Sequence, residues 1–195
     1  MTFEPFASRS HEKMKEVLMH PEAQGPAIHY YMIRGGKKKR NITVWESGTV
    51  GGEYIKTYGH YHVDDLPETY WIVEGEGLVL LQKLVTENGV PQMGRVEDFK
   101  VVPVKAGDTV KIPGNCGHLA INTGKTWFVT FDDSPVATDD SASMPVHADY
   151  EMVKKMRGFA YYVIEKNGTP TLVRNTLYTE VQKTDFGGIE VVDSH

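Results

Sequence analysis

Short runs of β-branched, aromatic and aliphatic residues follow one another along most of the chain, separated by clusters of glycine, proline, asparagine and aspartate. This pattern is typical of β-strands joined by turns. We expect strands at residues 42–45, 54–57, 69–73, 78–82, 101–104, 109–112, 119–122 and 127–131. Asn88-Gly89 and Asn167-Gly168 predict hairpin turns, because both central positions of a type I′ turn need positive φ. The second turn joins residues 159–165 to residues 169–175.

Helices are expected only as minor additions to these strands. Ser10 can cap a helix over residues 10–19, and Pro21 ends it. A further helical turn is expected at residues 149–156, with Asp149 as its cap. Residues 132–150 lack periodicity and are rich in aspartate, serine and proline, which predicts a long loop that can act as a lid.

The chain reads as one domain. Its 195 residues are enough for one sizeable core and few for two, and no internal repeat or linker divides them. We expect a single domain over residues 1–195, with a core at about 26–175, an N-terminal helical segment at 1–25 and a C-terminal tail at 176–195. Many short strands at close spacing favour an all-β sandwich or barrel.

Composition and charge narrow the class of protein. Hydrophobic residues make up 40% and charged residues 24% of the chain, as in ordinary globular proteins. The formal net charge of -5 offers no basic surface, so nucleic acid is excluded as a partner. The single cysteine, Cys116, excludes an internal disulfide and fits a reducing compartment. The N-terminus carries charges where a signal peptide is apolar, and no run approaches the ~20 apolar residues of a membrane helix, so we expect a cytoplasmic protein.

Two histidines and a glutamate lie close together in the stretch "GHYHVDDLPE". His60 and His62 point to one side of an extended strand, because residues two apart share a face. If this strand pairs as a hairpin with the next one, Glu68 reaches the same volume, and His118, after the turn at 113–115, can be the fourth group. Three imidazoles and a carboxylate suit Zn, Fe, Mn or Ni better than calcium or magnesium. A His-x-His pair also arises by chance in a chain with 8 histidines.

The spacing around these residues resembles the paired motifs of the cupin superfamily, G-x5-H-x-H-x3,4-E-x6-G and G-x5-P-x-G-x2-H-x3-N. The first motif matches His60, His62, Glu68 and Gly75, and the second matches residues 107–122. Five residues separate His62 from Glu68 instead of three or four, and a glycine directly follows Pro113 in the second motif. Neither departure removes a ligand. The resemblance implies an all-β cupin barrel (a double-stranded β-helix, or jelly roll) with a short N-terminal helix.

Longer stretches resemble one cupin family. The segments "NITVWESGTVGGEYIKTYGHYH", "PETYWIVEGEGLVLLQ", "VKAGDTVKIPGNCGHLAINTG" and "GFAYYVIEKNG" are similar to the cupin-type glucose-6-phosphate isomerases, over about residues 26–175. The family implies a homodimeric, metal-dependent enzyme that interconverts glucose 6-phosphate and fructose 6-phosphate. By motif position its metal ligands here are His60, His62, Glu68 and His118.

The same resemblance assigns the substrate contacts. It implies that Thr43, Thr57 and Gly59 contact the phosphate and that Tyr70 lines the sugar pocket, although strand threonines are more often ordinary. Strict alternation places Thr57 opposite His60, so this role needs a bulge near Gly59. A family tyrosine that contacts substrate falls near residues 29–31, where the alignment leaves its position open.

The chain departs from the family between residues 134 and 150. Ser134-Pro135 replaces the usual Tyr-Pro, and the family's Gly-His-Asp-Tyr reads here as His147-Ala148-Asp149-Tyr150. Tyr150 matches the family tyrosine, and His147 lies one place early. These departures bear on substrate identity and leave the fold and metal ligands untouched.

The ligand set allows more than one chemistry. Glu68 can be a ligand, the base that removes a C–H proton, or both, and a base is typically worth about 10²–10⁴ in rate. A hydride shift between C1 and C2 is the alternative route. Tyr70 can hydrogen-bond the substrate or Glu68, or it is simply a packed aromatic residue.

Two other functions compete with isomerisation. Another metal-dependent cupin enzyme, such as an Fe(II) dioxygenase, would use the same donors, and oxygen consumption would distinguish it. A non-catalytic module that binds a sugar phosphate is the second, and the complete ligand set counts against it. The sequence leaves the metal, the chemical route and the oligomeric state open.

Overall fold

The computed structural model describes residues 7–34, 41–62, 65–135 and 148–192, and over these residues the protein is almost entirely β. Its two short helices are α1 (His11–Met14) and α2 (Glu151–Lys155). Its strands are β1 (Ala7–Ser10), β2 (Ile28–Ile33), β3 (Asn41–Trp45), β4 (Thr49–Val50), β5 (Glu53–Tyr54), β6 (His60–His62), β7 (Glu68–Glu74), β8 (Glu76–Glu87), β9 (Val90–Lys105), β10 (Thr109–Ile112), β11 (Gly117–Asn122), β12 (Phe128–Asp132), β13 (Ala148–Asp149), β14 (Tyr161–Lys166), β15 (Thr169–Arg174), β16 (Glu180–Asp185) and β17 (Glu190–Val192).

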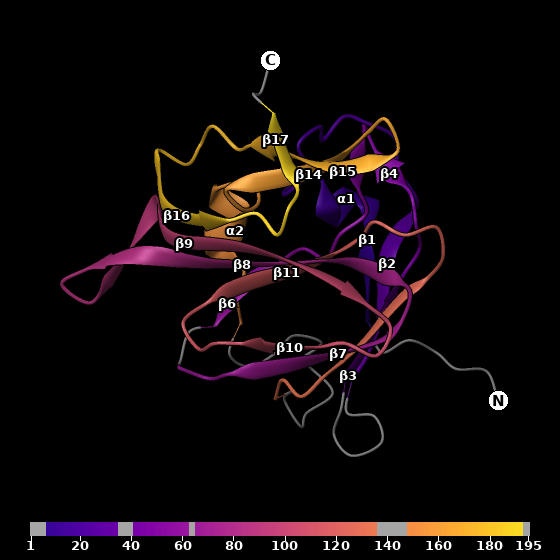
Figure 1. The fold of residues 1–195 in the computed structure, drawn as a ribbon, viewed down its shortest axis with the longest axis horizontal. Helices are drawn as coiled ribbons and strands as arrows, with labels where there is room; N and C mark the ends of the chain where they lie inside the picture. The colour runs from indigo at the N-terminus through magenta and orange to yellow at the C-terminus, as the bar shows by residue number, and fades with distance from the viewer. Residues whose placement is uncertain (1–6, 35–40, 63–64, 136–147, 193–195) are drawn as a thin grey trace.

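Two six-stranded sheets form the barrel. The first has the order β1-β2-β3-β12-β7-β10 and the second the order β13-β6-β11-β8-β9-β16. In Figure 1 they lie as facing layers, with β7 and β10 in the lower layer and β8, β9 and β11 in the layer above. A third sheet, β17-β15-β14-β5-β4, lies on the outer side of the second sheet.

The strand pairing is that of a jelly roll. Strand β3 pairs with β12, β6 with β11, β7 with β10, and β8 with β9, all antiparallel and nested inside one another. Between β3 and β12 the chain alternates between the two sheets, apart from β4 and β5, which join the third sheet, and the β8–β9 hairpin at the centre of the nest. This arrangement is a double-stranded β-helix, which confirms the predicted fold class.

Apolar side chains fill the space between the sheets and the space outside the second sheet. Trp45 and Phe128 are fully buried and meet edge to face, with ring centroids 4.8 Å apart. On the outer side of the second sheet, Phe99 of β9 packs against Tyr161 of β14 at 4.9 Å. Because both sides are covered, every residue of β11 is buried. The strand that carries His118 is therefore held in the interior.

Both predicted hairpin turns are confirmed. Asn88 and Gly89 have φ of 50° and 77°, and Asn167 and Gly168 have φ of 54° and 78°. The second turn joins β14 to β15, as expected. Asparagine and glycine tolerate this left-handed region better than other residues, which explains their use here.

The N-terminal helix is shorter than predicted. It ends at Met14, although Ser10 caps it as expected by accepting a hydrogen bond from the Lys13 N–H at 3.2 Å. Beyond the helix, Val17 is completely buried and its carbonyl accepts a hydrogen bond from Lys56 Nζ at 2.7 Å. Tertiary contacts therefore fix this segment in place of further helical hydrogen bonds.

Further segments differ in detail from the sequence expectation. The expected strand at 54–57 is shortened to β5, and α2 begins two residues after Asp149, whose carboxylate accepts a hydrogen bond from the Glu151 N–H at 2.8 Å. The segment expected as a C-terminal tail contains β16, parallel to β9, and β17, parallel to β15. Within the described part of the chain, no helix is long and apolar enough to cross a membrane.

Candidate metal centre

His60, His62, Glu68 and His118 come together inside the barrel from three strands. His60 and His62 belong to β6, His118 belongs to β11, and the register places His118 directly opposite His60. Glu68 opens β7 in the facing sheet. The strands of His62 and Glu68 therefore do not pair as the hairpin that was considered from the sequence. The chain crosses between the sheets here, and this crossing still delivers Glu68 to the histidines.

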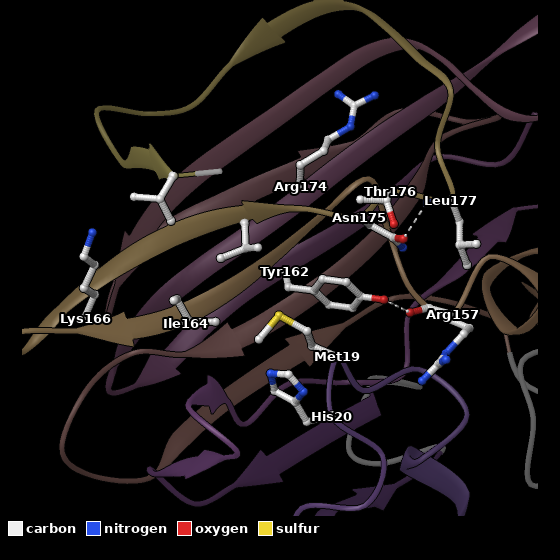
Figure 2. A pocket seen from close by; sticks show the side chains of 12 residues that line it. Met19, His20, Arg157, Tyr162, Ile164, Lys166, Arg174, Asn175, Thr176 and Leu177 are labelled. Carbon is white, nitrogen blue, oxygen red and sulfur yellow. Dashed lines mark hydrogen bonds between the residues drawn. The ribbon is translucent and has the colours of Figure 1, made fainter. Parts of the chain in front are cut away.

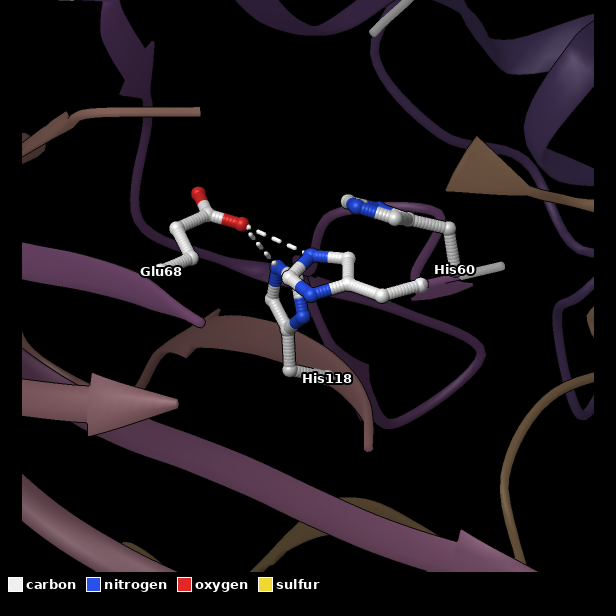
Figure 3. A group of neighbouring side chains, drawn as sticks. His60, Glu68 and His118 are labelled. Atoms are coloured by element: carbon white, nitrogen blue, oxygen red, sulfur yellow. Dashed lines mark hydrogen bonds and ion pairs between the residues drawn. The ribbon is translucent and has the colours of Figure 1, made fainter. Parts of the chain in front are cut away.

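The four side chains are close enough to share one ion. Glu68 Oε2 lies 3.0 Å from His62 Nε2 and 3.4 Å from His118 Nε2 (Figure 3). One ligand atom from each residue can be chosen so that all lie within 4.8 Å of one another. Ligand atoms about 2.1 Å from a common ion lie no more than about 4.2 Å apart. Closure around an ion therefore needs a movement of at least about half an ångström, and more for a tetrahedral site.

Unpartnered nitrogens support this interpretation of the cluster. Among the described residues, His60 Nε2 and both ring nitrogens of His118 are buried and have no hydrogen-bond partner. Leaving a buried polar atom unsatisfied costs about 1–3 kcal/mol, so such atoms are rare without a reason. An ion would satisfy His60 Nε2 and one nitrogen of His118. The residues present fit a metal ion.

His62 is held in a defined orientation. Its Nδ1 lies 2.7 Å from the Leu66 carbonyl oxygen, to which it donates, and this leaves Nε2 facing Glu68. Burial lowers the pKa of His62, but the hydrogen bond with Glu68 and the charge of that carboxylate outweigh burial, and the pKa is raised. A metal ion bound here would take the place of the hydrogen in the bond between His62 Nε2 and Glu68.

Burial sets the charge of the other members. It lowers the pKa of His60 to about 3 and the pKa of His118 well below its ordinary value. Both rings are therefore neutral at neutral pH, which is the form that binds metals. Burial raises the pKa of Glu68 to about 7, against the opposing effect of its hydrogen bond with His62. The donor set suits Zn, Fe, Mn and Ni alike and does not select among them.

One cavity joins the cluster to the predicted substrate residues. Thr43, Thr57, Gly59, Tyr70 and Tyr150 line the same cavity as His60, Glu68 and His118. His147 lies outside the described residues. The irregularity predicted near Gly59 is present, because Gly59 has φ of +80° and the chain is not extended there. Thr57 and His60 can therefore face the same cavity, which strict alternation would forbid.

Two of the cavity tyrosines pack directly on the histidines. The ring of Tyr70 meets that of His118 edge to face at 5.2 Å, and the ring of Tyr150 lies 5.2 Å from that of His60. Burial raises the pKa of Tyr70 well above its ordinary value and that of Tyr150 to about 12. Both phenols are therefore protonated at neutral pH and can donate a hydrogen bond.

Sequence reasoning gave no definite role to four residues that line this cavity, Tyr30, Met32, Arg34 and Asp132. Arg34 Nη1 lies 3.9 Å from Asp132 Oδ2. Tyr30 falls in the segment where the family tyrosine could not be aligned. Alternation along β2 places Tyr30, Met32 and Arg34 on one face, so this signal was available in the sequence.

The cavity is small in this conformation. Its free volume is about 40 Å³, whereas pockets for small molecules usually measure about 300–1,000 Å³. A hexose phosphate therefore enters only if side chains around it move. A larger hollow of about 550 Å³ lies beside β14 and β15, where Met19 and His20 face Tyr162 (Figure 2). It contains none of the four candidate ligands.

A family model and the similar proteins indicate the same family. The family model described as "Glucose-6-phosphate isomerase (GPI)" matches residues 25–180. A glucose-6-phosphate isomerase of Pyrococcus abyssi is 31% identical over 170 residues, which cover 84% of this chain and 78% of that protein. One of Thermococcus onnurineus is 33% identical over 134 residues, which cover 68% of this chain. The chain spans only 60% of the length of this second relative.

The similar solved structures have lower sequence identity to this chain than the two isomerases do. A predicted oxalate decarboxylase from Thermotoga maritima is 19% identical with a TM-score of 0.40, and the match covers 68% of this chain and 96% of that one. The oxalate decarboxylase of Lactobacillus farciminis is 14% identical with a TM-score of 0.39, covering 65% of this chain and 32% of that one. Neither likeness indicates a function for this chain.

Proposed function

Because the chain belongs to the glucose-6-phosphate isomerase family, we propose that it interconverts glucose 6-phosphate and fructose 6-phosphate. The observation that carries the proposal is the buried group of His60, His62, Glu68 and His118 at the wall of a cavity lined by the residues that the resemblance assigns to the substrate. Isomerisation of an aldose to a ketose moves two hydrogens between neighbouring carbons. The site must therefore polarise two oxygens, move one hydrogen between the two carbons and move one proton between the two oxygens.

The cofactor of this proposal is one divalent transition metal ion per subunit, Fe, Mn, Ni or Zn, held by the four clustered side chains. When bound, such an ion supplies Lewis acidity that polarises the carbonyl and hydroxyl oxygens and lowers the barrier to removing the neighbouring C–H proton. The neutral rings of His60 and His118 and the oriented ring of His62 support this assignment.

Glu68 is the proposed base. Two carboxylates line the cavity, but Asp132 Oδ1 already accepts hydrogen bonds from Asn41 Nδ2 at 2.6 Å and from the Ser134 N–H at 3.1 Å. These bonds hold Asp132 in place and oppose the rise in its pKa that burial causes. Glu68 makes a single hydrogen bond within the described part of the chain, with His62 Nε2 at 3.0 Å, so it is the less constrained of the two carboxylates.

The remaining cavity residues bind and orient the substrate in this proposal. Thr43, Thr57 and Gly59 contact the phosphate, and Tyr150 and His147 complete its binding. Tyr70 donates a hydrogen bond from its protonated phenol to a sugar oxygen. The small free volume means that these side chains close on the substrate only after the cavity has widened. We also propose a cytoplasmic homodimer, from the family resemblance.

The direct test is turnover of fructose 6-phosphate, detected by a coupled assay for glucose 6-phosphate, with oxygen recorded in the same cell. We expect product formation without oxygen uptake. Oxygen uptake that depends on substrate would favour the dioxygenase alternative, and binding without turnover would favour the non-catalytic module. Running the reaction in deuterated water separates the chemical routes, because proton transfer through Glu68 introduces deuterium into the product and a hydride shift does not.

A further inference from the structure

We infer that Arg34 binds the phosphate group of the substrate and is the charged residue that contacts this anion in the cavity. The inference rests on the proposed isomerase function and extends it, because none of the residues assigned to the phosphate so far carries a permanent positive charge. A phosphate monoester is close to a dianion at neutral pH. A guanidinium is the side chain best shaped to hold it, through two parallel hydrogen bonds.

The fold places Arg34 beside the predicted phosphate residues. Arg34 directly follows β2, and Tyr30, Met32 and Arg34 all line the cavity, as expected for alternate residues of one strand. Met32 is paired in register with Thr43 on β3, which also lines the cavity. The guanidinium therefore belongs to the same wall as Thr43.

The donors of Arg34 are buried and largely unused. Its side chain exposes only 9% of its surface, and Nε has no hydrogen-bond partner among the described residues. Nη2 contacts only the Met32 thioether at 3.1 Å, which is a weak acceptor. A guanidinium has five N–H donors, and burying them without acceptors is costly. This is the state expected of a residue whose acceptors arrive with the ligand.

Asp132 does not fully account for Arg34. The closest approach between them is 3.9 Å, from Nη1 to Oδ2, which is longer than a hydrogen bond. Asp132 is held instead by the neutral donors Asn41 Nδ2 and Ser134 N–H. The long pair with Asp132 leaves the guanidinium free to bind a second anion.

The charge balance of the cavity also favours Arg34 as a phosphate contact, beside the proposed divalent ion and Arg9, whose guanidinium lies 5.9 Å from the centre of the Tyr150 ring. Among the described residues that line the cavity, Arg34 is the only lysine or arginine, and the rings of His60 and His118 are neutral. Glu68 and Asp132 are the acidic groups there. A phosphate entering beside two carboxylates is repelled unless a positive charge faces it. Arg34 supplies that charge on the protein itself.

The test is Arg34→Met, which keeps much of the side-chain length and removes the charge. For the metal-loaded protein we expect the KM for fructose 6-phosphate to rise about ten- to a hundredfold, as for loss of hydrogen bonds to a charged group. We expect kcat to change much less, because the phosphate is remote from the reacting carbons and binds equally in the ground and transition states. Calorimetry should show a matching loss of affinity for inorganic phosphate, with unchanged metal content.

Two further variants complete the design. Arg174→Met is the matched control, because its guanidinium donates to the Tyr161 hydroxyl at 3.1 Å and to the Tyr178 carbonyl at 3.0 Å, away from this cavity. It should leave the KM and phosphate affinity unchanged. Arg34→Lys keeps the charge without the planar fork, so it should fall between wild type and Arg34→Met. If Arg34→Met folds poorly, Arg34→Lys alone still tests whether the guanidinium contributes to phosphate binding.

A purely structural role predicts a different pattern. If Arg34 only neutralises Asp132, adding Arg34→Met to Asp132→Asn changes neither the KM nor the affinity for inorganic phosphate, and the inference is overturned. The inference is also overturned if Arg34→Lys and Arg34→Met both keep the metal content and the phosphate affinity of the wild type. The wild-type protein could bind phosphate without isomerase turnover, and Arg34→Met could then lose that phosphate binding. In that case the inference stands and the proposed function fails.

Discussion

His118 on β11 lies directly opposite His60 on β6, and their ring centroids are 4.4 Å apart. The two residues belong to different sequence motifs, and the nested pairing of the jelly roll brings them together. Each ring presents an unpartnered buried nitrogen. The metal centre is therefore a consequence of strand register, and a change of register by one residue would turn one ring out of the cavity.

His60→Ala combined with His118→Ala should remove the metal and the activity and leave the fold intact. Each replacement removes one of the four donors, and even loss of an outer hydrogen-bond partner costs about 10–100-fold in metal affinity. Metal content measured after purification should fall from about one ion per chain to near zero. Far-ultraviolet circular dichroism serves as the control for folding. Stoichiometric metal in the double variant would contradict the ligand assignment.

Metal binding to the stripped protein should release more protons at pH 6 than at pH 8. Burial raises the pKa of Glu68 to about 7 in the ion-free protein, so the carboxyl is mostly protonated below that pH and mostly ionised above it. An ion binds the carboxylate and displaces the proton, so release grows as the pH falls through the pKa. Calorimetry in buffers of different ionisation enthalpy measures this number. Glu68→Gln should show less release, and an equal release at both pH values in the wild type would exclude this role of Glu68.

Gly59→Ala should reduce kcat/KM by about tenfold or more, because small displacements of catalytic groups are costly. Gly59 has φ of +80°, and an added Cβ would lie 3.1 Å from the Leu119 Cβ and 3.3 Å from the His118 carbonyl oxygen. Gly89→Ala is the matched control, because Gly89 has φ of +77° and nothing lies within 4 Å of an added Cβ. Both variants should lose about 1–2 kcal/mol of stability from the left-handed backbone, measured by urea unfolding. An activity loss of the same size in Gly89→Ala would show that the effect is general.

Lys56→Met should lower the free energy of unfolding by about 3–5 kcal/mol. Lys56 and Glu53 form an ion pair with side chains only 3% and 1% exposed. Glu53 also accepts a hydrogen bond from the Met19 N–H at 2.8 Å, so the pair anchors the N-terminal segment. Removing one partner leaves a buried charge without compensation. The double variant Lys56→Met with Glu53→Gln should recover part of the loss in urea unfolding, and no recovery would mean that the hydrogen bonds matter more than the charge.

The ligand cluster could be predicted because each of its two parts has a recognisable local motif, and the family resemblance links the two motifs. The spacing of His60, His62, Glu68 and His118 matches motifs, and Gly59 signals the break that turns Thr57 toward the cavity. The sheet to which each strand belongs depends on contacts distant in sequence. For this reason the hairpin considered between the strands of His62 and Glu68 does not form, although the two residues lie close together as the sequence suggested.

Other features needed the assembled structure. The helix expected at 10–19 ends early because Val17 is fixed by Lys56, which comes from a distant part of the chain. Arg34 and Asp132 meet because β2 and β12 flank β3 in one sheet, an order that periodicity cannot reveal. Their roles could be considered only once they were seen to line the cavity of the metal cluster.

The most direct measurement is isomerase turnover of chelator-stripped protein, refilled separately with Fe(II), Mn(II), Ni(II) and Zn(II) beside an unfilled sample. Fructose 6-phosphate is the substrate and glucose 6-phosphate the detected product. We predict negligible turnover in the unfilled protein, restored turnover with at least one ion, and no restoration in the His60→Ala, His118→Ala double variant. Full turnover in the unfilled protein would contradict a metal-dependent mechanism, and stoichiometric metal without turnover for any ion would contradict the proposed reaction.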